Sequence, residues 1–452
     1  MLNPPGLKLY LRDYYCSKVA KAHYSYAPID LLMLSGRFED LDFIDAIQAR
    51  LTPKSCLDLI RRKAPAAIVS LVSAVSWSED KEFLSAVKRM LPQTKILVSG
   101  DVVLEMDEGR MAKAPWLDAV ILDFMNSDAL EYLRGNHDRI QQMVFRDQEG
   151  RIIRRTSPRL YGAITDLPRP RHEMFLEQGY TYPFVRHRAF ATVQSDYGCP
   201  FPCRFCVMAR LGYGQRPVQE VITELQWLKE LGVREIYFND QTFGAQPARL
   251  EQLCRAMMEA GLQLGWCCWS RVDSVYPHLE LMKRAGCHTI MFGVESASDE
   301  TLRFYRKGFT QDQVQETFRT CRELGIRTLA AYLLGLPNED AAMIMRTIEG
   351  AVDLGSDFAS FNVYVPRQNS ELRQEMALNG LHLEEEVVLD QSGHTVALPG
   401  KGLSPQELKS LRDLAMRRYY LRPPYILDRL RGVRTWYDLS TLFRIASSML
   451  WS

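Results

Sequence analysis

The chain of 452 residues lacks the features that would assign it to several broad classes of protein. Its charge is almost balanced, with 56 Lys and Arg residues against 55 Asp and Glu residues. Proteins that bind nucleic acid usually carry a basic field, so we expect no nucleic-acid partner. The longest apolar run, residues 64–77, is about fourteen residues, short of the roughly twenty that a membrane-spanning helix needs. No apolar leader follows Met1, which predicts a cytoplasmic protein.

Cysteine is sparse over most of the sequence and concentrated in one stretch. Three of the ten cysteines, Cys199, Cys203 and Cys206, fall within nine residues. An odd number of thiols in a cytoplasmic chain argues against disulfides, and a zinc site would need a fourth ligand at close spacing. Three thiolates on one loop can hold three corners of an iron–sulfur cube and leave the fourth iron open. The stretch predicts a 4Fe–4S cluster, with a zinc-stapled, non-enzymatic binding protein as the alternative.

This Cys-x3-Cys-x2-Cys loop, directly after the apolar run 189–193, resembles that of the radical S-adenosylmethionine (radical SAM) enzymes. The resemblance implies that the three cysteines bind a 4Fe–4S cluster and that S-adenosylmethionine chelates the fourth iron. Cleavage of the sulfonium would then give a 5'-deoxyadenosyl radical, with the electron supplied by a donor such as flavodoxin or ferredoxin. Phe205, the aromatic residue before the third cysteine, would pack near the adenine.

Residues 1–145 alternate short apolar runs with amphipathic helices, which predicts a doubly wound parallel sheet of Rossmann-like type. Thr52 and Pro53 are typical of a helix start. Sheets of this kind bind ligands beyond the carboxyl ends of their strands. The apolar runs that we interpret as strands are 29–34, 43–47, 67–72, 95–100 and 119–123.

This half resembles the cobalamin-binding domain that precedes the radical domain in one branch of the superfamily. The Asp-x-His-x-x-Gly signature, whose histidine ligates cobalt in many cobalamin proteins, is absent, and that branch often lacks it. Trp77 would lie against the corrin, the alternative being an ordinary core aromatic. Residues 1–5 resemble the end of the domain's first strand, so we expect a truncated start or a trimmed domain. The residues expected at cobalamin are Ser70, Ser73, Trp77, Ser99, Gly100 and Asp123.

The Arg- and Pro-rich segment 146–185 is interpreted as a linker. Residues 186–375 then repeat strand and helix six times, with strands expected at 189–193, 235–238, 264–269, 289–292, 327–334 and 358–365. Six such units predict a six-stranded partial (β/α) barrel whose active site lies at the carboxyl ends of the strands.

Polar clusters follow these strands, so one mouth could be lined by all of them. The family's usual Gly-Gly-Glu is replaced by residues 239–241, which would hold the methionine amino group, and Glu295 would contact the ribose or methionine. Alternatives are that Asp240 caps a helix, that Arg271 pairs with Asp273, and that Gly335 belongs to a plain turn. The resemblance assigns the following residues to S-adenosylmethionine: Phe205, Asn239, Asp240, Gln241, Arg271, Glu295, Gly335 and Val365.

Residues 376–452 form a helical tail. Ser404 and Glu407 form a capping box, and an arginine-rich stretch precedes an apolar stripe at 439–450. A basic segment followed by such a stripe could dock peripherally on a membrane or close over a lipid-like substrate. The alternative is a helix packed on the flank of the barrel.

The sequence therefore predicts a cobalamin-dependent radical SAM enzyme that methylates an unactivated carbon of a small or lipid-like metabolite. A cyclisation, rearrangement or oxidation without methyl transfer is the main alternative. Methylthiolation would usually require a second cluster from three amino-terminal cysteines, and only Cys16 and Cys56 precede Cys199. The sequence identifies no general base, and the catalytic residues beyond the cofactor ligands stay unknown.

Overall fold

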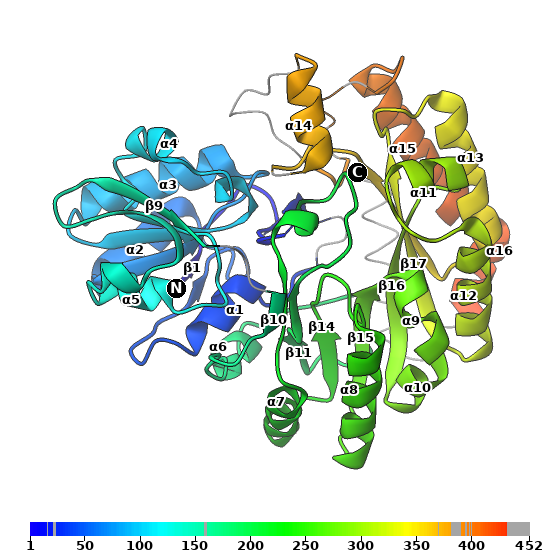
Figure 1. Cartoon of the computed structure of the whole chain (residues 1–452), viewed down its shortest axis with the longest axis horizontal. Helices are drawn as coiled ribbons and strands as arrows, with labels where there is room; N and C mark the ends of the chain where they lie inside the picture. The colour runs from blue at the N-terminus through cyan, green and yellow to red at the C-terminus, as the bar shows by residue number, and fades with distance from the viewer. Residues whose placement is uncertain are drawn as a thin grey trace.

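A computed structural model describes residues 1–15, 17–20, 24–157, 161–368, 370–380, 390–393, 396, 398 and 400–431. Two α/β units lie side by side: an amino-terminal unit on the left of Figure 1 and a larger unit on the right. Each is built on its own sheet, of seven and six strands respectively. Among the described residues, no helix is both long and apolar enough to cross a membrane.

The amino-terminal sheet has the strand order β4-β1-β5-β6-β7-β8-β9. Its first five strands in this order pair in parallel, as predicted, and β8 and β9 add an antiparallel hairpin at one edge. The strands are β1 (Leu2–Asn3), β4 (Ile44–Asp45), β5 (Ala67–Leu71), β6 (Lys95–Ser99), β7 (Ala119–Ile121), β8 (Gln142–Arg146) and β9 (Ile152–Thr156). The helices are α1 (Ile29–Ser35), α2 (Pro53–Lys63), α3 (Trp77–Met90), α4 (Glu108–Ala112) and α5 (Asp128–Leu133).

The structure confirms the predicted helix start at Thr52 and contradicts the predicted strand at 29–34. Helix α2 begins as predicted, since the Thr52 side chain accepts a hydrogen bond from the Ser55 N–H and Pro53 occupies the first turn. The prediction of a strand at 29–34 is wrong, because these residues form helix α1. All of α1 is buried, so its apolar run has no polar face whose period would distinguish a helix from a strand.

The segment 146–185, expected to be a linker, carries regular structure that joins the two units. Strand β9 completes the amino-terminal sheet, and β10 (Tyr161–Ala163) pairs in parallel with β13 (Tyr213–Gln215). Helix α6 (His172–Leu176) places the His172 ring 2.8 Å from Glu224 of the second unit. The hairpin was missed because β9 is an edge strand that exposes arginines and lacks an apolar run.

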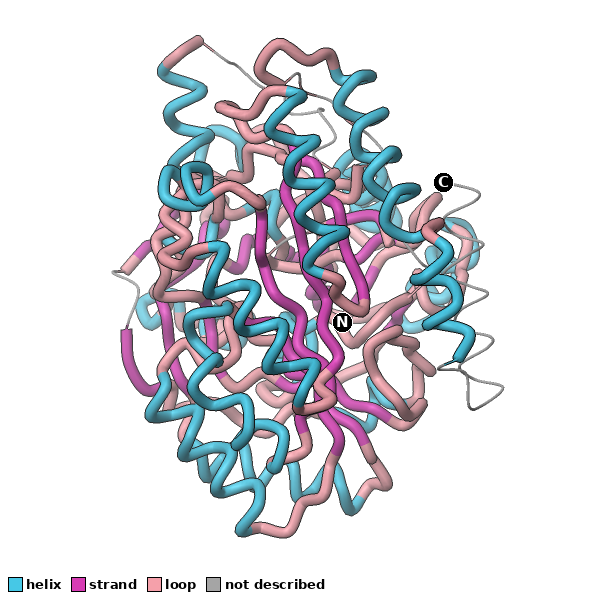
Figure 2. Tube along the Cα trace, turned by 90° about the vertical axis from the view of Figure 1, so that its right-hand side faces the viewer, coloured by secondary structure: helices cyan, strands magenta, loops and turns pink. Residues whose placement is uncertain are grey.

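The second unit is a partial barrel of six parallel strands in the order β11-β14-β15-β16-β17-β18, as predicted. Helices cover the outside of these strands, which Figure 2 shows from the helical side. The strands are β11 (Phe190–Val193), β14 (Glu235–Phe238), β15 (Gly265–Ser270), β16 (Cys287–Glu295), β17 (Arg327–Leu334) and β18 (Phe358–Val363). The connecting helices are α7 (Val218–Glu230), α8 (Pro247–Glu259), α9 (Val272–Val275), α10 (Leu279–Arg284), α11 (Asp299–Phe304), α12 (Gln311–Glu323) and α13 (Ala341–Leu354).

After the barrel come α14 (Glu371–Leu378), α15 (Pro405–Tyr420) and α16 (Pro423–Arg431). The predicted capping box of Ser404 and Glu407 opens α15. Arg422 donates to the Val352 carbonyl at 2.8 Å and Arg429 pairs with Asp357 at 3.0 Å, so this basic stretch packs on the flank of the barrel. The predicted apolar stripe at 439–450 lies outside the described residues.

Candidate active site

The three cysteines lie on a loop whose two ends are tied together. Strand β12 (Asp196–Gly198) pairs antiparallel with β13, and the Cys199 N–H donates to the Gly212 carbonyl at 3.2 Å. Gly198 has φ 72°, and a Cβ atom there would lie 2.0 Å from the Gly212 oxygen. Only glycine therefore permits this approach of the two backbones. Main-chain contacts thus tie the two ends of the cysteine loop together.

Asp240, at the carboxyl end of β14, holds the start of the same hairpin. Its Oδ1 accepts the N–H groups of Ser195 at 2.7 Å and Asp196 at 3.0 Å, and its Oδ2 accepts the Ser195 hydroxyl at 2.6 Å. Burial raises the pKa of Asp240, and burial together with the Asp240 charge raises the pKa of Asp196 to about 7. Asp240 thus positions the backbone that leads into the cysteine loop.

Positive charge surrounds the second cysteine. The Arg271 guanidinium lies 3.6 Å from the Cys203 sulfur, covers the Phe201 ring at 3.8 Å and pairs with Asp273 at 2.8 Å. Arg271 therefore pairs with Asp273 and also faces the cysteine loop, so the two interpretations of this residue are compatible. Arg271 therefore places a positive charge beside the cysteine loop.

Glu295 occupies a strained position at the end of β16. Its φ of 70° is left-handed, and the pairing of β16 with β17 shifts register beside it. Its Oε1 accepts from Lys307 Nζ at 3.0 Å. A Cβ atom on Gly293 would lie 2.5 Å from that oxygen, so glycine leaves room for the carboxylate. Left-handed backbone costs a non-glycine residue about 1–2 kcal/mol, and such strain concentrates at functional sites.

Lys307 stays charged in this environment although it is buried. Burial works to lower the pKa of its ammonium group, but Glu295 and the Cys203 thiol together hold the pKa above its ordinary value. The chain therefore brings two cations, Arg271 and Lys307, beside the cysteine loop. Sequence reasoning missed Lys307 because it does not follow a strand.

A cavity of about 360 Å³ collects most of the predicted residues. They reach it from the ends of four neighbouring strands, β11, β14, β15 and β16, so the expected common mouth exists. Gly335 and Val365 are not among the described residues that line it, and Gly335 faces Leu408 of α15 instead. The predicted residues in the cavity wall are Cys199, Cys203, Phe205, Cys206, Asn239, Asp240, Gln241, Arg271 and Glu295.

The amino-terminal unit also contributes to this cavity, which the sequence did not predict. Asp13, Tyr24 and Tyr26 line it beside the barrel residues Tyr237 and Trp269. The Tyr26 hydroxyl donates to Asp13 at 3.2 Å, and the Tyr26 ring meets the Tyr237 ring edge-on at 5.3 Å. The sequence feature that could have indicated this contribution is the high frequency of tyrosine between residues 10 and 26.

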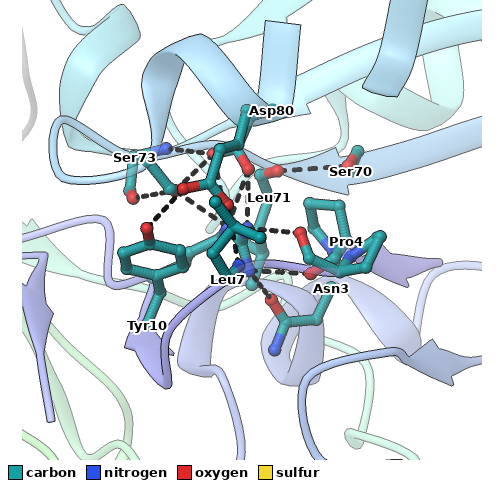
Figure 3. A network of polar contacts seen from close by, with 12 residues as sticks. Asn3, Pro4, Leu7, Tyr10, Ser70, Leu71, Ser73 and Asp80 are labelled. Atoms are coloured by element: carbon teal, nitrogen blue, oxygen red, sulfur yellow. Dashed lines mark hydrogen bonds and ion pairs between the residues drawn. The ribbon is translucent and has the colours of Figure 1, made fainter. Parts of the chain in front are cut away.

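We define the amino-terminal strap as residues 7–15 and 17–20. It crosses the carboxyl edge of the amino-terminal sheet and is clamped there by Arg12, whose guanidinium pairs with Asp80 at 2.6 Å and donates to Asn3 and the Pro4 carbonyl. Figure 3 shows Asp80, Asn3 and Pro4 within the surrounding network of polar contacts. Both charged side chains are fully buried. Removing one partner of such a pair costs about 3–5 kcal/mol, so the pair of Arg12 and Asp80 fixes the strap firmly to the sheet.

The residues predicted for cobalamin have contacts with other residues of the amino-terminal unit. Ser99 donates to Asp30 at 2.9 Å, the Ser73 and Ser76 hydroxyls lie 2.7 Å apart, and Asp123 accepts from the Met125 N–H at 2.8 Å. The Ser70 hydroxyl donates to the Leu71 carbonyl, Gly100 lies against the Val72 carbonyl, and the Trp77 ring lies 6.3 Å from that of Trp116, in the core. Beside these strand ends lies a small cavity of about 20 Å³, and Tyr15 separates it from the larger cavity.

The arrangement of thiols distinguishes between kinds of metal site. In the part of the chain that the structure describes, no three His, Cys, Asp or Glu side chains converge on one metal position. Zinc requires its ligands around a single ion at about 2.0–2.3 Å, whereas the thiolates of a cluster site bind different irons. Three thiolates on one loop are the ligand set of a 4Fe–4S cluster with one open iron.

A partial parallel barrel with a three-cysteine loop at its mouth defines the architecture of a radical SAM domain. Residues 194–377 match the model of the radical SAM superfamily, so this part of the chain is a radical SAM domain and the protein is an enzyme. It is 27% identical to an uncharacterized methyltransferase of Pyrococcus horikoshii, over 92% of this chain and 88% of that one.

Two further proteins resemble the chain over most of its length. It is 23% identical to the anaerobic magnesium-protoporphyrin IX monomethyl ester cyclase of Cereibacter sphaeroides, over 93% of this chain and 67% of that one. Its fold is similar to that of the radical S-adenosylmethionine methyltransferase TsrM of Kitasatospora setae, solved with cobalamin and a 4Fe–4S cluster. The TM-score is 0.65 at 16% identity, with 80% of this chain and 76% of TsrM covered.

Proposed function

We propose that this enzyme is a cobalamin-dependent radical SAM methyltransferase acting on an unactivated carbon of a small or lipid-like metabolite. The observation that carries the proposal is the cavity in which three loop thiols meet the polar ends of the neighbouring strands. Methyl transfer is supported by the similarity to the Pyrococcus relative and to TsrM, both of which are methyltransferases by name.

Cys199, Cys203 and Cys206 would hold a 4Fe–4S cluster. With S-adenosylmethionine it supplies a 5'-deoxyadenosyl radical that takes hydrogen from carbon. The chain's own residues offset charge and orient the cofactor: Arg271 stands beside the thiolates, and Asn239 lines the cavity with a buried Nδ2 that has no partner among the described residues. Because Nδ2 is a donor, Asn239 would serve the methionine carboxylate rather than the amino group that we expected residues 239–241 to hold; a buried donor left unpaired costs about 1–3 kcal/mol.

Cobalamin enters the proposal through the similar fold of TsrM, which was solved with cobalamin bound. The strap covers the strand ends at which we expected it, and the open space there is about 20 Å³. Cobalamin binding at this edge therefore requires the strap to leave it. Absorbance of cobalamin retained by the purified protein tests this part separately.

An external electron donor, a flavodoxin or ferredoxin, belongs to the proposal, and so does a cytoplasmic location. The described cysteines Cys56, Cys199, Cys203, Cys254, Cys267, Cys268, Cys287 and Cys321 are free thiols, which suits a reducing compartment. A reducing compartment also preserves an exposed iron–sulfur cluster.

A second candidate function is a radical cyclisation without methyl transfer. It is favoured by the cyclase of Cereibacter sphaeroides, which is similar over 93% of this chain. Product mass separates the two functions, because methylation adds one methyl group and cyclisation adds none.

The test is anaerobic reconstitution with iron and sulfide, followed by reduction in the presence of S-adenosylmethionine. We expect brown cluster absorbance and formation of 5'-deoxyadenosine. Cys203→Ala should abolish both while the protein stays soluble, and Cys254→Ala, which removes a buried core thiol of α8, should retain both. A wild-type protein that forms no cluster or no deoxyadenosine would refute the proposed function.

A further inference from the structure

Helix α15 lines the active-site cavity along one face. Arg412, Met416 and Tyr420, four residues apart, all belong to the cavity wall. Residues at this spacing lie above one another on a helix. The Tyr420 hydroxyl donates to the Ala359 carbonyl at 2.6 Å near the start of β18, and Leu408 contacts Gly335 after the end of β17. The helix therefore runs antiparallel to β18, with Arg412 closer to the mouth than Tyr420.

This helix stands at the edge of the sheet opposite the cysteine loop. Strands β11 and β18 are the two edge strands of the barrel sheet, and the cysteine loop follows β11 whereas α15 packs on β18. The cavity extends between the two edges. A molecule that fills it contacts α15 as well as the cofactor residues.

Arg412 is a buried cation with an incomplete set of partners. Its side chain is 4% exposed, and its Nη1 donates to Asp413 Oδ1 at 2.9 Å. Asp413 also accepts from Lys409 at 2.8 Å, so one carboxylate serves two cations. The Arg412 Nε has no hydrogen-bond partner among the described residues. Buried charges are normally paired and buried donors normally bonded, so this guanidinium has unused capacity.

The other charged side chains in the cavity wall have interaction partners within the protein. Arg271 pairs with Asp273, and Lys307 pairs with Glu295. Asp240 accepts three hydrogen bonds from the hairpin that it holds. Arg412, in contrast, has a buried side-chain donor with no partner among the described residues, so we assign the binding of an external anion to it.

We propose that Arg412 binds a carboxylate group of the substrate. The guanidinium fork matches a carboxylate geometrically, and a charge-assisted hydrogen bond is stronger than a neutral one. The cavity wall also includes the side chains of Met416, Tyr420, Phe358 and Trp269, which suit an apolar portion of the substrate. This inference rests on the proposed function only in that it treats the bound acid as the substrate.

The test measures binding of three acids and their amides to the reconstituted full-length enzyme by isothermal titration calorimetry. The probes are benzoate, hexanoate and indole-3-propanoate, each compared with its own amide. We expect at least one acid to bind tenfold or more tightly than its amide. Arg412→Gln should abolish this preference, Arg412→Lys should retain part of it, and Arg417→Gln, an exposed position on the same helix, should leave it unchanged.

Asp413→Asn is an independent variant, because it removes the carboxylate that competes for Arg412. It should increase the ratio of acid to amide affinity. The inference is overturned if no pair shows a preference for the acid, if the preference survives in Arg412→Gln, or if Asp413→Asn leaves the ratio unchanged. Formation of 5'-deoxyadenosine without substrate, measured on the same samples, reports on the proposed function separately: its loss in wild type refutes that function, whereas loss of the acid preference alone refutes this inference.

Discussion

The backbone contact between Gly198 and Gly212 should control whether the cysteine loop can hold a cluster. In Gly198→Ala, the new Cβ would lie 2.0 Å from the Gly212 oxygen, a distance at which the two strands must separate. The residue also has φ 72°, which a non-glycine residue adopts at a cost of about 1–2 kcal/mol. Overpacking adds typically 1–3 kcal/mol, so we expect a total loss of about 2–5 kcal/mol.

Gly232→Ala is the matched control for this variant. Gly232 has φ 85°, but nothing lies within 4 Å of a Cβ atom added there. It therefore incurs only the backbone cost, about 1–2 kcal/mol. The difference between the two variants isolates the contact with Gly212.

The assay combines urea unfolding, followed by circular dichroism, with iron content after anaerobic reconstitution. We expect Gly198→Ala to unfold at lower urea concentration than Gly232→Ala and to bind less iron, because Cys199 is the next residue along the chain. Equal stability in the two variants, together with full iron content in Gly198→Ala, would refute the reasoning. The steric contact would then carry no consequence for the loop.

Two further perturbations follow from the ion pairs. Glu224→Gln should lower the free energy of unfolding by about 3 kcal/mol, because it leaves Arg216 and His172 without their buried partner, whereas Glu230→Gln on the exposed face of the same helix should have little effect. Burial works to raise the pKa of Glu224, but Arg216 and His172 bring it to about 2. The stability that this carboxylate contributes to the wild type should therefore be lost as the pH falls from the unfolded pKa of 4.5 toward 2. The same loss of stability with acid in Glu224→Gln would contradict this. Lys307→Met should weaken binding of S-adenosylmethionine about tenfold in equilibrium dialysis while iron content is retained, because its charge-assisted hydrogen bond to the cavity carboxylate is worth about 1.5–3 kcal/mol; unchanged affinity would show that this pair does not orient the cofactor.

The sequence predicted the barrel because each strand is an apolar run that ends in polar residues. The cysteine loop, residues 239–241 and Glu295 all follow strands, and parallel strands bring their carboxyl ends to the same edge. Gly335 and Val365 also follow strands but lie outside the cavity wall, and Leu408 of α15 packs against Gly335. Position along the chain thus predicted the edge but not which side chains reach the cavity.

The residues that were missed come from distant segments. Asp13, Tyr26 and Arg412 reach the cavity through packing of the strap region and α15 on the barrel, and no local pattern encodes such contacts. The helix at 29–35 was missed for a different reason. It is buried on all sides, so its composition resembles that of an inner strand.

The packing of the amino-terminal strap on later parts of the chain has a consequence for synthesis. The Val19 N–H bonds to Asp390, which lies 371 residues further on, and Gln194 donates to the Tyr15 hydroxyl across 179 residues. At roughly 5–20 residues per second, a ribosome delivers the distal partner roughly 20–75 s after the strap has emerged. During that interval the tyrosine-rich strap lacks the later residues that it contacts in the folded protein. The emerging chain should therefore depend on chaperones more at its beginning than at its end.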